Sequence, residues 1–327
     1  MEYTRLGETE LEVSRVCFGT WQLGGDWGDI DAEQAKAAMR RALELGINFF
    51  DTAQAYGFGR SEQVVGEALR DEIENDRESI VLATKGGLRP DPAGDGLTRD
   101  AGRDWLRQGV EESLEHLGTD YIDLYQVHWP DADTPAEETA HALQELVEEG
   151  KIRYVGVSNY SAGQMLAFER YVKLDALQPP YHIFRREIEK HVLPYTEAHG
   201  VGTLVYGPLA HGLLAGKYDE DTTFPDGDWR SQLSAFSGDV FAHNLEIVER
   251  LKKLAFDRGI TLVQLAVAWV LAHPAVDVAI VGARTPEHIE GTAPAADLFL
   301  TDDDLIEIAD IIEDAIPIGG ATPEGVD

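Results

Sequence analysis

The chain has little that could cross-link it or carry positive charge. Among its 327 residues there is one cysteine, Cys17, which excludes an internal disulfide. Only 27 side chains are basic against 60 that are acidic, and the formal net charge is −33. Nucleic-acid binders and proteins that dock on anionic membranes need a basic face, because their partners are covered in phosphates. We therefore expect neither nucleic acid nor a membrane among its partners.

Long apolar runs and metal-binding patterns are also missing. No segment reaches the ~18 consecutive apolar residues of a membrane span, and residues 1–5 lack the basic and apolar regions of a signal peptide. We therefore expect a cytoplasmic protein. The histidines and the single cysteine show no spacing typical of a zinc site, so we expect no metal. Nothing in the sequence indicates the oligomeric state.

Lysine is scarce as well. Of the 27 basic side chains only 8 are lysines and 19 are arginines. An acid excess with few lysines is typical of a protein that works in concentrated salt, where a Debye length of roughly 3 Å at 1 M screens the self-repulsion. The alternative is an ordinary acidic enzyme. Disorder does not follow, since 43% of the residues are hydrophobic, which is enough to build a core.

Short apolar runs alternate with helical patterns from one end of the chain to the other. The predicted strands are 16–20, 47–51, 79–84, 121–127, 153–157, 176–178, 202–206 and 278–281. Eight strands with helices between them and no long linker predict a single (β/α)8 TIM barrel domain over residues 1–327. The alternative is a doubly wound sheet, but the G-x-G-x-x-G fingerprint of that fold does not follow the first strand.

The sequence predicts three additions to the barrel. Residues 1–14 are expected to form an N-terminal β-hairpin, residues 301–314 an extra C-terminal helix, and residues 315–327 a loose tail. Two loops, 86–99 and 217–237, are longer than a barrel needs. Loops of that length are uncommon unless they serve a site.

Polar side chains follow several predicted strands at the point where each strand ends, which is where barrels place their active sites. Asp51 ends the second strand, Tyr56 follows it between glycines, Lys85 ends the third and His128 the fourth. Each alone is more often a cap, a solvated charge or a packing residue. Together they are harder to dismiss, because Lys85 follows an apolar run and needs an anion, which Asp51 could supply.

The four side chains have a shared chemical logic. A free tyrosine has a pKa near 10 and is a poor proton donor at neutral pH. A nearby lysine ammonium favours the phenolate and so lowers that pKa. Asp51 would hold Lys85 charged, and His128 could donate a hydrogen bond to a substrate oxygen. Such a set can protonate an oxygen anion while hydride reaches the adjoining carbon.

With these residues in place, the sequence resembles the aldo-keto reductase family over essentially its whole length. The matching stretches, in chain order, are Phe18-Gly19-Thr20-Trp21, Asp51-Thr52-Ala53 with Tyr56-Gly57 and Ser61-Glu62, Ala83-Thr84-Lys85, Asp123-Leu124-Tyr125 with His128-Trp129-Pro130, Gly156-Val157-Ser158-Asn159, Gln178 with Tyr181, Pro208-Leu209 with Gly212-Leu213, and Gly282-Ala283-Arg284. Each piece alone is weak, but the ordered set is specific.

The resemblance implies a reversible, NAD(P)H-dependent reduction of an aldehyde or ketone to an alcohol, with NADP(H) the usual cofactor and NAD(H) possible. It implies that Tyr56 is the general acid, that Asp51 and Lys85 tune it, that His128 orients the carbonyl, and that the hairpin plugs the barrel. It places cofactor contacts at Gly19, Thr20, Trp21, Asp51, Ser158, Asn159, Gln178, Tyr206, Gly207, Pro208, Leu209, Gly212, Leu213, Gly282, Ala283, Arg284 and His288. It places substrate walls at Trp21, Tyr56, Phe58, His128 and Trp129.

Two questions stay open within the resemblance. Arg284 would favour NADPH, because a guanidinium fork matches the 2′-phosphate. The family more often has Gln at the position of His288 and Glu-Asn at that of Gly291-Thr292, and these departures leave both NADPH and NADH open as the preferred cofactor. The alternatives to a reductase are a nucleotide-sensing binding subunit, as in potassium-channel β subunits that resemble this family, and a barrel hydrolase that uses a metal.

Overall fold

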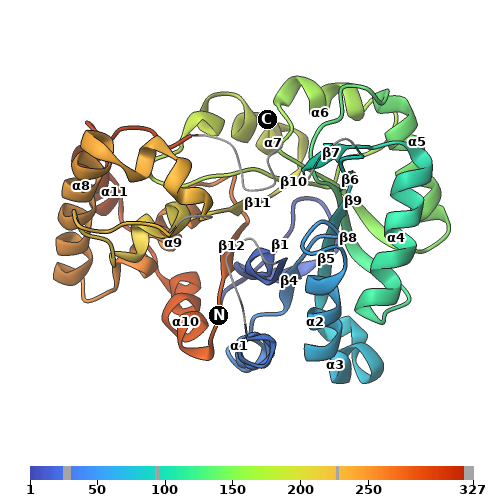
Figure 1. Ribbon diagram of the computed structural model, residues 1–327, viewed down its shortest axis with the longest axis horizontal. Coiled ribbons are helices and arrows are strands. Elements are labelled where there is room, and N and C mark those ends of the chain that lie inside the picture. The colour runs from blue at the N-terminus through green and yellow to red at the C-terminus, as the bar shows by residue number, and fades with distance from the viewer. Residues whose placement is uncertain (25–30, 93, 95, 226–227, 320–327) are drawn as a thin grey trace.

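Eight parallel strands close into a barrel in the computed structural model, which describes residues 1–24, 31–92, 94, 96–225 and 228–319 (Figure 1). Around the barrel the strands are β3 Val16–Gly19, β4 Phe49–Asp51, β5 Val81–Gly86, β8 Ile122–Val127, β9 Ile152–Ser158, β10 Ala176–Gln178, β11 Gly202–Tyr206 and β12 Val278–Gly282. β12 pairs with β3, with Ile280 opposite Cys17, and so closes the ring. The predicted (β/α)8 barrel is confirmed.

Helices cover the outside of the barrel and join consecutive strands (Figure 1). The α-helices are α1 Ala32–Glu44, α2 Arg60–Ala68, α3 Arg70–Asn75, α4 Arg103–Leu117, α5 Ala136–Glu148, α6 Ala162–Phe168, α7 Val192–His199, α8 Gly238–Asp257, α9 Leu262–Leu271, α10 Pro286–Thr292 and α11 Asp302–Ile311. Short 3₁₀ turns are η1 Trp21–Gly24, η2 Arg77–Ser79, η3 Glu187–Lys190, η4 Ala210–Ala215, η5 Trp229–Gln232, η6 Ser234–Phe236 and η7 Ala293–Asp297.

Local signals in the sequence explain where α1 starts and stops. The Asp31 side chain accepts hydrogen bonds from the backbone N–H groups of Glu33 and Gln34, which satisfies donors that a helix start leaves open. The buried face of α1 carries Ala35, Ala38, Met39 and Ala42 at helical spacing. The chain then turns at Gly46, whose φ of +87° suits glycine.

The N-terminal hairpin, β1 Tyr3–Arg5 and β2 Glu12–Ser14, contributes to the interior of the barrel. Its side chains Leu6, Leu11 and Val13 are buried in one cluster with Cys17 and Phe49 from the barrel strands. A second and larger cluster lies between the strands and the surrounding helices. The hairpin therefore fills the barrel from the end at which the strands begin and leaves the opposite end for a site.

Two expectations are corrected by the structure. The loop 86–99 contains a small antiparallel pair, β6 Leu88–Pro90 with β7 Leu97–Arg99. The first part of the predicted loose tail is held to the barrel, since Asn244 bonds both the N–H and the C=O of Ile316 and the Ile318 N–H donates to the Phe184 carbonyl. Residues 320–327 of that tail lie outside the described residues.

Within the described ranges, no single helix is both long enough and apolar enough to cross a membrane. The pair α8 and α9 passes on length and composition together, but it is bent by 91° at the break between the two helices.

Candidate active site at the carboxyl ends of the barrel strands

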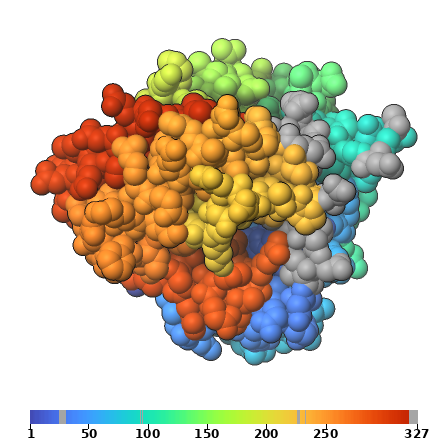
Figure 2. Space-filling model, turned by 60° about the vertical axis from the view of Figure 1, so that its left-hand side comes forward, coloured from blue at the N-terminus to red at the C-terminus, as the bar shows by residue number. Residues whose placement is uncertain are grey.

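A cavity of about 410 Å³ opens where the barrel strands end. Figure 2 shows its mouth as a hollow between the yellow segment after β11 and the orange-red segment after β12. The residues predicted for the site that line it are Gly19, Thr20, Trp21, Asp51, Tyr56, His128, Trp129, Ser158, Asn159, Gln178, Tyr206, Gly207, Pro208, Leu209, Gly212, Gly282, Arg284 and His288. Several of them are the last residues of their strands, so parallel pairing brings their side chains to one mouth.

Asp51, Lys85 and Tyr56 form a connected chain of polar atoms. The Lys85 ammonium lies 2.7 Å from Asp51 Oδ2, 2.9 Å from the Thr52 carbonyl and 3.4 Å from the Tyr56 hydroxyl. Lys85 is only 1% exposed and Asp51 only 3%, so the ion pair is buried, and both Asp51 and Tyr56 border the cavity. A buried charge needs such a partner, because an unpaired one costs several kcal/mol, about 3–5 when one partner is removed.

His128 completes the group predicted from the sequence. It follows β8, and its backbone N–H donates to the carbonyl of Gly86 at the end of β5. The imidazole meets the Tyr56 ring edge to face, with ring centroids 5.7 Å apart. Both side chains line the cavity, so a substrate oxygen placed between them can receive hydrogen bonds from both.

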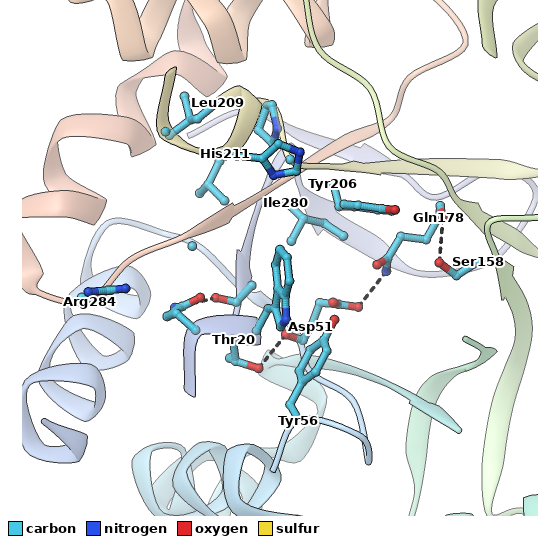
Figure 3. A pocket seen from close by; sticks show the side chains of 18 of the residues that line it. Thr20, Asp51, Tyr56, Ser158, Gln178, Tyr206, Leu209, His211, Ile280 and Arg284 are labelled. Carbon is cyan, nitrogen blue, oxygen red and sulfur yellow. Dashed lines mark hydrogen bonds between the residues drawn. The ribbon is translucent and has the colours of Figure 1, made fainter. Parts of the chain in front are cut away.

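A second polar group lies on the side of β9, β10 and β11. Ser158 Oγ donates to the Gln178 carbonyl, Asn159 Nδ2 donates to Ser158 Oγ, and the Tyr206 hydroxyl donates to Asn159 Oδ1. Asn159 has a left-handed φ of +63°, a conformation that asparagine tolerates better than most residues. The Gln178 amide donates to Asp51 Oδ1 at 2.9 Å, as drawn in Figure 3, and so connects this group to the ion pair.

The far end of the cavity is basic. Arg284 lies well away from Tyr56 in Figure 3, just beyond β12. Its backbone N–H donates to His288 Nδ1 in α10, and burial together with the charges of Lys217 and Arg284 lowers the pKa of His288. Arg230 also lines this cavity and forms an ion pair with Asp228. These cations stand out in a chain of net charge −33 and suit an anionic group.

Both long loops predicted to serve a site contact the cavity wall. Trp229 lies in the loop 217–237, and its ring centroid is 6.0 Å from that of Trp21 and 4.8 Å from that of His211. Arg99, at the end of β7, lies over the ring of Trp129 at 5.6 Å. These loops therefore support the aromatic side chains around the mouth.

Some predicted site residues do not line the cavity. Phe58 is 43% exposed, with a φ of +46°, and lies outside the lining. Leu213 and Ala283 are buried in the core instead. Lys85 reaches the site through its hydrogen bonds to Asp51 and Tyr56 rather than by facing the cavity.

Other lining residues were not singled out from the sequence. They are Gln22, His211, Arg230, Ile280 and Val281. Burial first, then the charges of Arg185 and Arg230, lower the pKa of His211 to about 4, so its imidazole is neutral at pH 7. The position of His211 between the predicted cofactor contacts Leu209 and Gly212 was a signal for it, whereas nothing in the loop 217–237 marked Arg230. In the described part of the chain no group of three or more His, Cys, Asp or Glu could hold a metal ion.

The fold and the site together define a barrel enzyme with a buried Lys–Asp pair beside a tyrosine at the carboxyl ends of its strands. The chain belongs to the aldo/keto reductase family, because the model of that family matches residues 15–313. This membership makes the protein an oxidoreductase.

Known relatives are similar over nearly the whole chain. The aldo-keto reductase YhdN of Bacillus subtilis is 44% identical over 98% of this chain and 96% of its own. The NADH-specific methylglyoxal reductase of Escherichia coli is 33% identical over 96% of this chain and all of its own length. The solved structure of the glycerol dehydrogenase AKR11B4 from Gluconobacter oxydans superposes with a TM-score of 0.88 at 40% identity, and the match covers 98% of this chain and 97% of that one.

Proposed function

We propose that this protein reduces an aldehyde or ketone to the alcohol with NAD(P)H, and that Tyr56 is the proton donor. The observation that carries the proposal is the buried contact chain from Asp51 through Lys85 to Tyr56, which ends at the cavity. The reaction is reversible, because the residue that gives a proton to an alkoxide can take it back from the alcohol.

The side chains at the two ends of the cavity suit the two ends of a nicotinamide dinucleotide. Ser158, Asn159 and Gln178 offer hydrogen-bonding groups suited to the carboxamide, and the Tyr206 ring offers a flat face for the nicotinamide. Arg284, at the opposite end, offers a cation for a phosphate. When bound, the cofactor supplies the hydride.

The protein's own groups then manage the charge that appears on the substrate oxygen. His128 and Tyr56 hold the carbonyl oxygen by hydrogen bonds, and Tyr56 passes its proton to that oxygen. The Lys85 ammonium stabilises the phenolate that remains, since it lies 3.4 Å from the hydroxyl. Asp51 holds Lys85 charged and oriented at 2.7 Å. Trp21 and Trp129 provide apolar walls that exclude water.

NADPH is the cofactor we propose, on the strength of Arg284. A guanidinium pairs with a phosphate through two parallel hydrogen bonds, and NADH has no 2′-phosphate to offer. A relative carries the name of an NADH-specific enzyme, so the preference needs a direct test. Arg284→Gln is expected to weaken NADPH binding at least tenfold and NADH binding little, by titration of tryptophan fluorescence. Equal affinity of the wild type for NADPH and NADH contradicts the proposed role of Arg284 in binding the 2′-phosphate.

We also propose that the enzyme works in concentrated salt inside the cell. The support is the net charge of −33 with only 8 lysines. A dinucleotide phosphate must approach a strongly acidic protein, and salt screens that long-range repulsion while the close contact to Arg284 is screened less. Cofactor affinity is therefore expected to hold or rise as KCl increases. A steep fall with the fold intact contradicts the proposal.

The decisive experiment replaces the proposed acid. Tyr56→Phe removes the hydroxyl 3.4 Å from Lys85 and keeps the ring. We expect carbonyl reduction to fall by 100-fold or more, on the order of what a positioned acid contributes, while NADPH still binds. The matched control is Tyr171→Phe, which removes a hydroxyl from a residue that is 42% exposed, and wild-type rates are expected. Full activity of Tyr56→Phe excludes the assigned acid. Tight cofactor binding by the wild type without turnover on many carbonyls favours the nucleotide-sensing alternative instead.

A further inference from the structure

Gln126 is a fully buried amide that the chemistry above does not use. It lies in β8, two residues before His128, and its exposed fraction is 0%. Strand register places it beside Lys85 of β5 on one side and Gly156 of β9 on the other. A polar side chain in this position needs hydrogen-bond partners, because an unpaired buried amide costs free energy.

Three hydrogen bonds join Gln126, Asp51 and Gln178 in a closed triangle. Gln126 Nε2 donates to Asp51 Oδ1 at 3.2 Å, and Gln178 Nε2 donates to the same oxygen at 2.9 Å. Gln178 Nε2 also donates to Gln126 Oε1 at 3.2 Å. Asp51 Oδ1 is thus held by two amides, which leaves Oδ2 for the Lys85 ammonium.

The triangle determines which way each amide points. If the Gln126 amide turned over, its oxygen would face the carboxylate and its NH₂ would face the NH₂ of Gln178, and both contacts would be repulsive. Gln178 uses its NH₂ on Asp51 and Gln126, so its Oε1 is the atom left to accept a bond. Because Gln178 lines the cavity, that acceptor serves whatever donor enters there.

The neighbouring strand is shaped to accept the Gln126 side chain. A Cβ on Gly156 would come 2.8 Å from Gln126 Cγ, closer than real Cβ atoms approach. The glycine in β9 therefore makes the room in which the Gln126 side chain lies. A second and separate feature of the sequence thus supports the same arrangement.

We propose that Gln126 is a positioning residue that fixes the Gln178 amide as an acceptor for the cofactor's carboxamide and ties it to the Asp51–Lys85 pair. The inference rests on the proposed function and deepens it. It makes the carboxamide pocket and the proton donor parts of one hydrogen-bonded unit. Loss of Gln126 removes one of the two partners that fix the Gln178 amide, and it removes one of the two amide donors to Asp51 Oδ1.

The test replaces Gln126 by an apolar side chain of similar length. In Gln126→Met, both hydrogen bonds of the amide are lost while the volume is nearly kept. The matched control is Gln144→Met on the surface of α5, where the amide bonds only the exposed Glu148. Two ligands are titrated into each protein, NADPH and 2′-phospho-ADP-ribose, which lacks the nicotinamide and its carboxamide. If the wild type prefers NADH, then NADH and ADP-ribose take their place.

Gln126→Met is expected to bind NADPH about fivefold to tenfold more weakly, as the loss of one or two hydrogen bonds implies, and to bind 2′-phospho-ADP-ribose like the wild type. Its kcat is expected to fall, and the alkaline pH at which activity is half lost is expected to rise, because the Asp51 charge offsets more of the Lys85 charge near Tyr56. The Gln144→Met control is expected to match the wild type in both affinities, in kcat and in the pH profile. A purely structural role of Gln126 would weaken both ligands equally and leave the pH profile in place, and that result overturns the inference.

A second variant, Gln126→Glu, keeps the shape and adds a titratable group beside Asp51 and Lys85 and within reach of Gln178. The introduced carboxyl is expected to preserve activity at low pH, where it is protonated, and to lose it as the pH rises and two carboxylates meet. Activity that follows the wild-type pH profile contradicts the proposal. A wild type without carbonyl reduction defeats the proposed function, whereas an active wild type with an unchanged Gln126→Met defeats only the positioning role.

Discussion

The buried Lys85–Asp51 pair allows stability and chemistry to be separated in one set of variants. Lys85→Met removes an ammonium that is 1% exposed and leaves the Asp51 carboxylate without its cation. Removing one partner of a buried pair typically costs about 3–5 kcal/mol. Here the remaining carboxylate keeps hydrogen bonds from Gln126 and Gln178, so we expect the lower end, about 3 kcal/mol.

The second variant in the set removes the other charge. Asp51→Asn removes the negative charge that faces Lys85 and leaves it only neutral partners such as the Thr52 carbonyl and the Tyr56 hydroxyl, so we expect a loss of similar size. In the double variant Lys85→Met with Asp51→Asn no buried charge is left unpaired. Its stability should return to within about 1–2 kcal/mol of the wild type, since neutral replacements of buried pairs are often tolerated. Its activity should stay lost, because no ammonium faces the Tyr56 hydroxyl.

The assay is urea unfolding followed by tryptophan fluorescence in molar KCl, alongside carbonyl reduction followed by NADPH absorbance. The coupling energy from the double-mutant cycle measures the pair directly. A Lys85→Met variant as stable as the wild type, or a double variant no more stable than the singles, would show that these charges do not compensate one another as described. Recovery of activity in the double variant would remove Lys85 from the chemistry.

Three further predictions concern pH, packing and salt. The pKa of His211 lies near 4 in the folded protein against about 6.5 for an ordinary histidine, so the unfolded chain binds the extra proton and stability falls as pH drops from 6.5 towards 4. The loss of unfolding free energy is about 3 kcal/mol when complete. His211→Gln should therefore make the urea midpoints at pH 5 and pH 7.5 more alike, and an unchanged difference between them refutes this role of His211. Gly86→Ala should lower the free energy of unfolding strongly, because its Cβ would lie 1.9 Å from the Tyr125 hydroxyl. Adding Tyr125→Phe should restore part of that loss, and no rescue means that the strain lies elsewhere. Thermal midpoints should rise with KCl and change less with sucrose, because screening of the charge of −33 is specific to salt; equal rises contradict that account.

The main elements of the fold were readable from the sequence because their signals are local. Such signals act over a few residues each: the Asp31 cap and the turn at Gly46 mark the two ends of α1 as observed. The β6–β7 pair was missed because its strands are three residues long and lie in a loop without an apolar alternation. The packing of the tail was missed because Asn244 and Phe184, which hold Ile316 and Ile318, are far from it in sequence.

The sequence by itself determined which side chains stand at or near the strand ends, since short apolar runs followed by polar residues fix positions such as Asp51 and Lys85. Only the tertiary structure decided which of those residues touch. Closure of the barrel puts β4, β8 and β10 around one centre, so that Gln126 and Gln178 share one oxygen of Asp51 although 52 residues separate the two glutamines. Phe58 is exposed and Arg230 lines the cavity. Neither position could be predicted, because loop geometry and packing across the mouth leave no periodic pattern in the sequence.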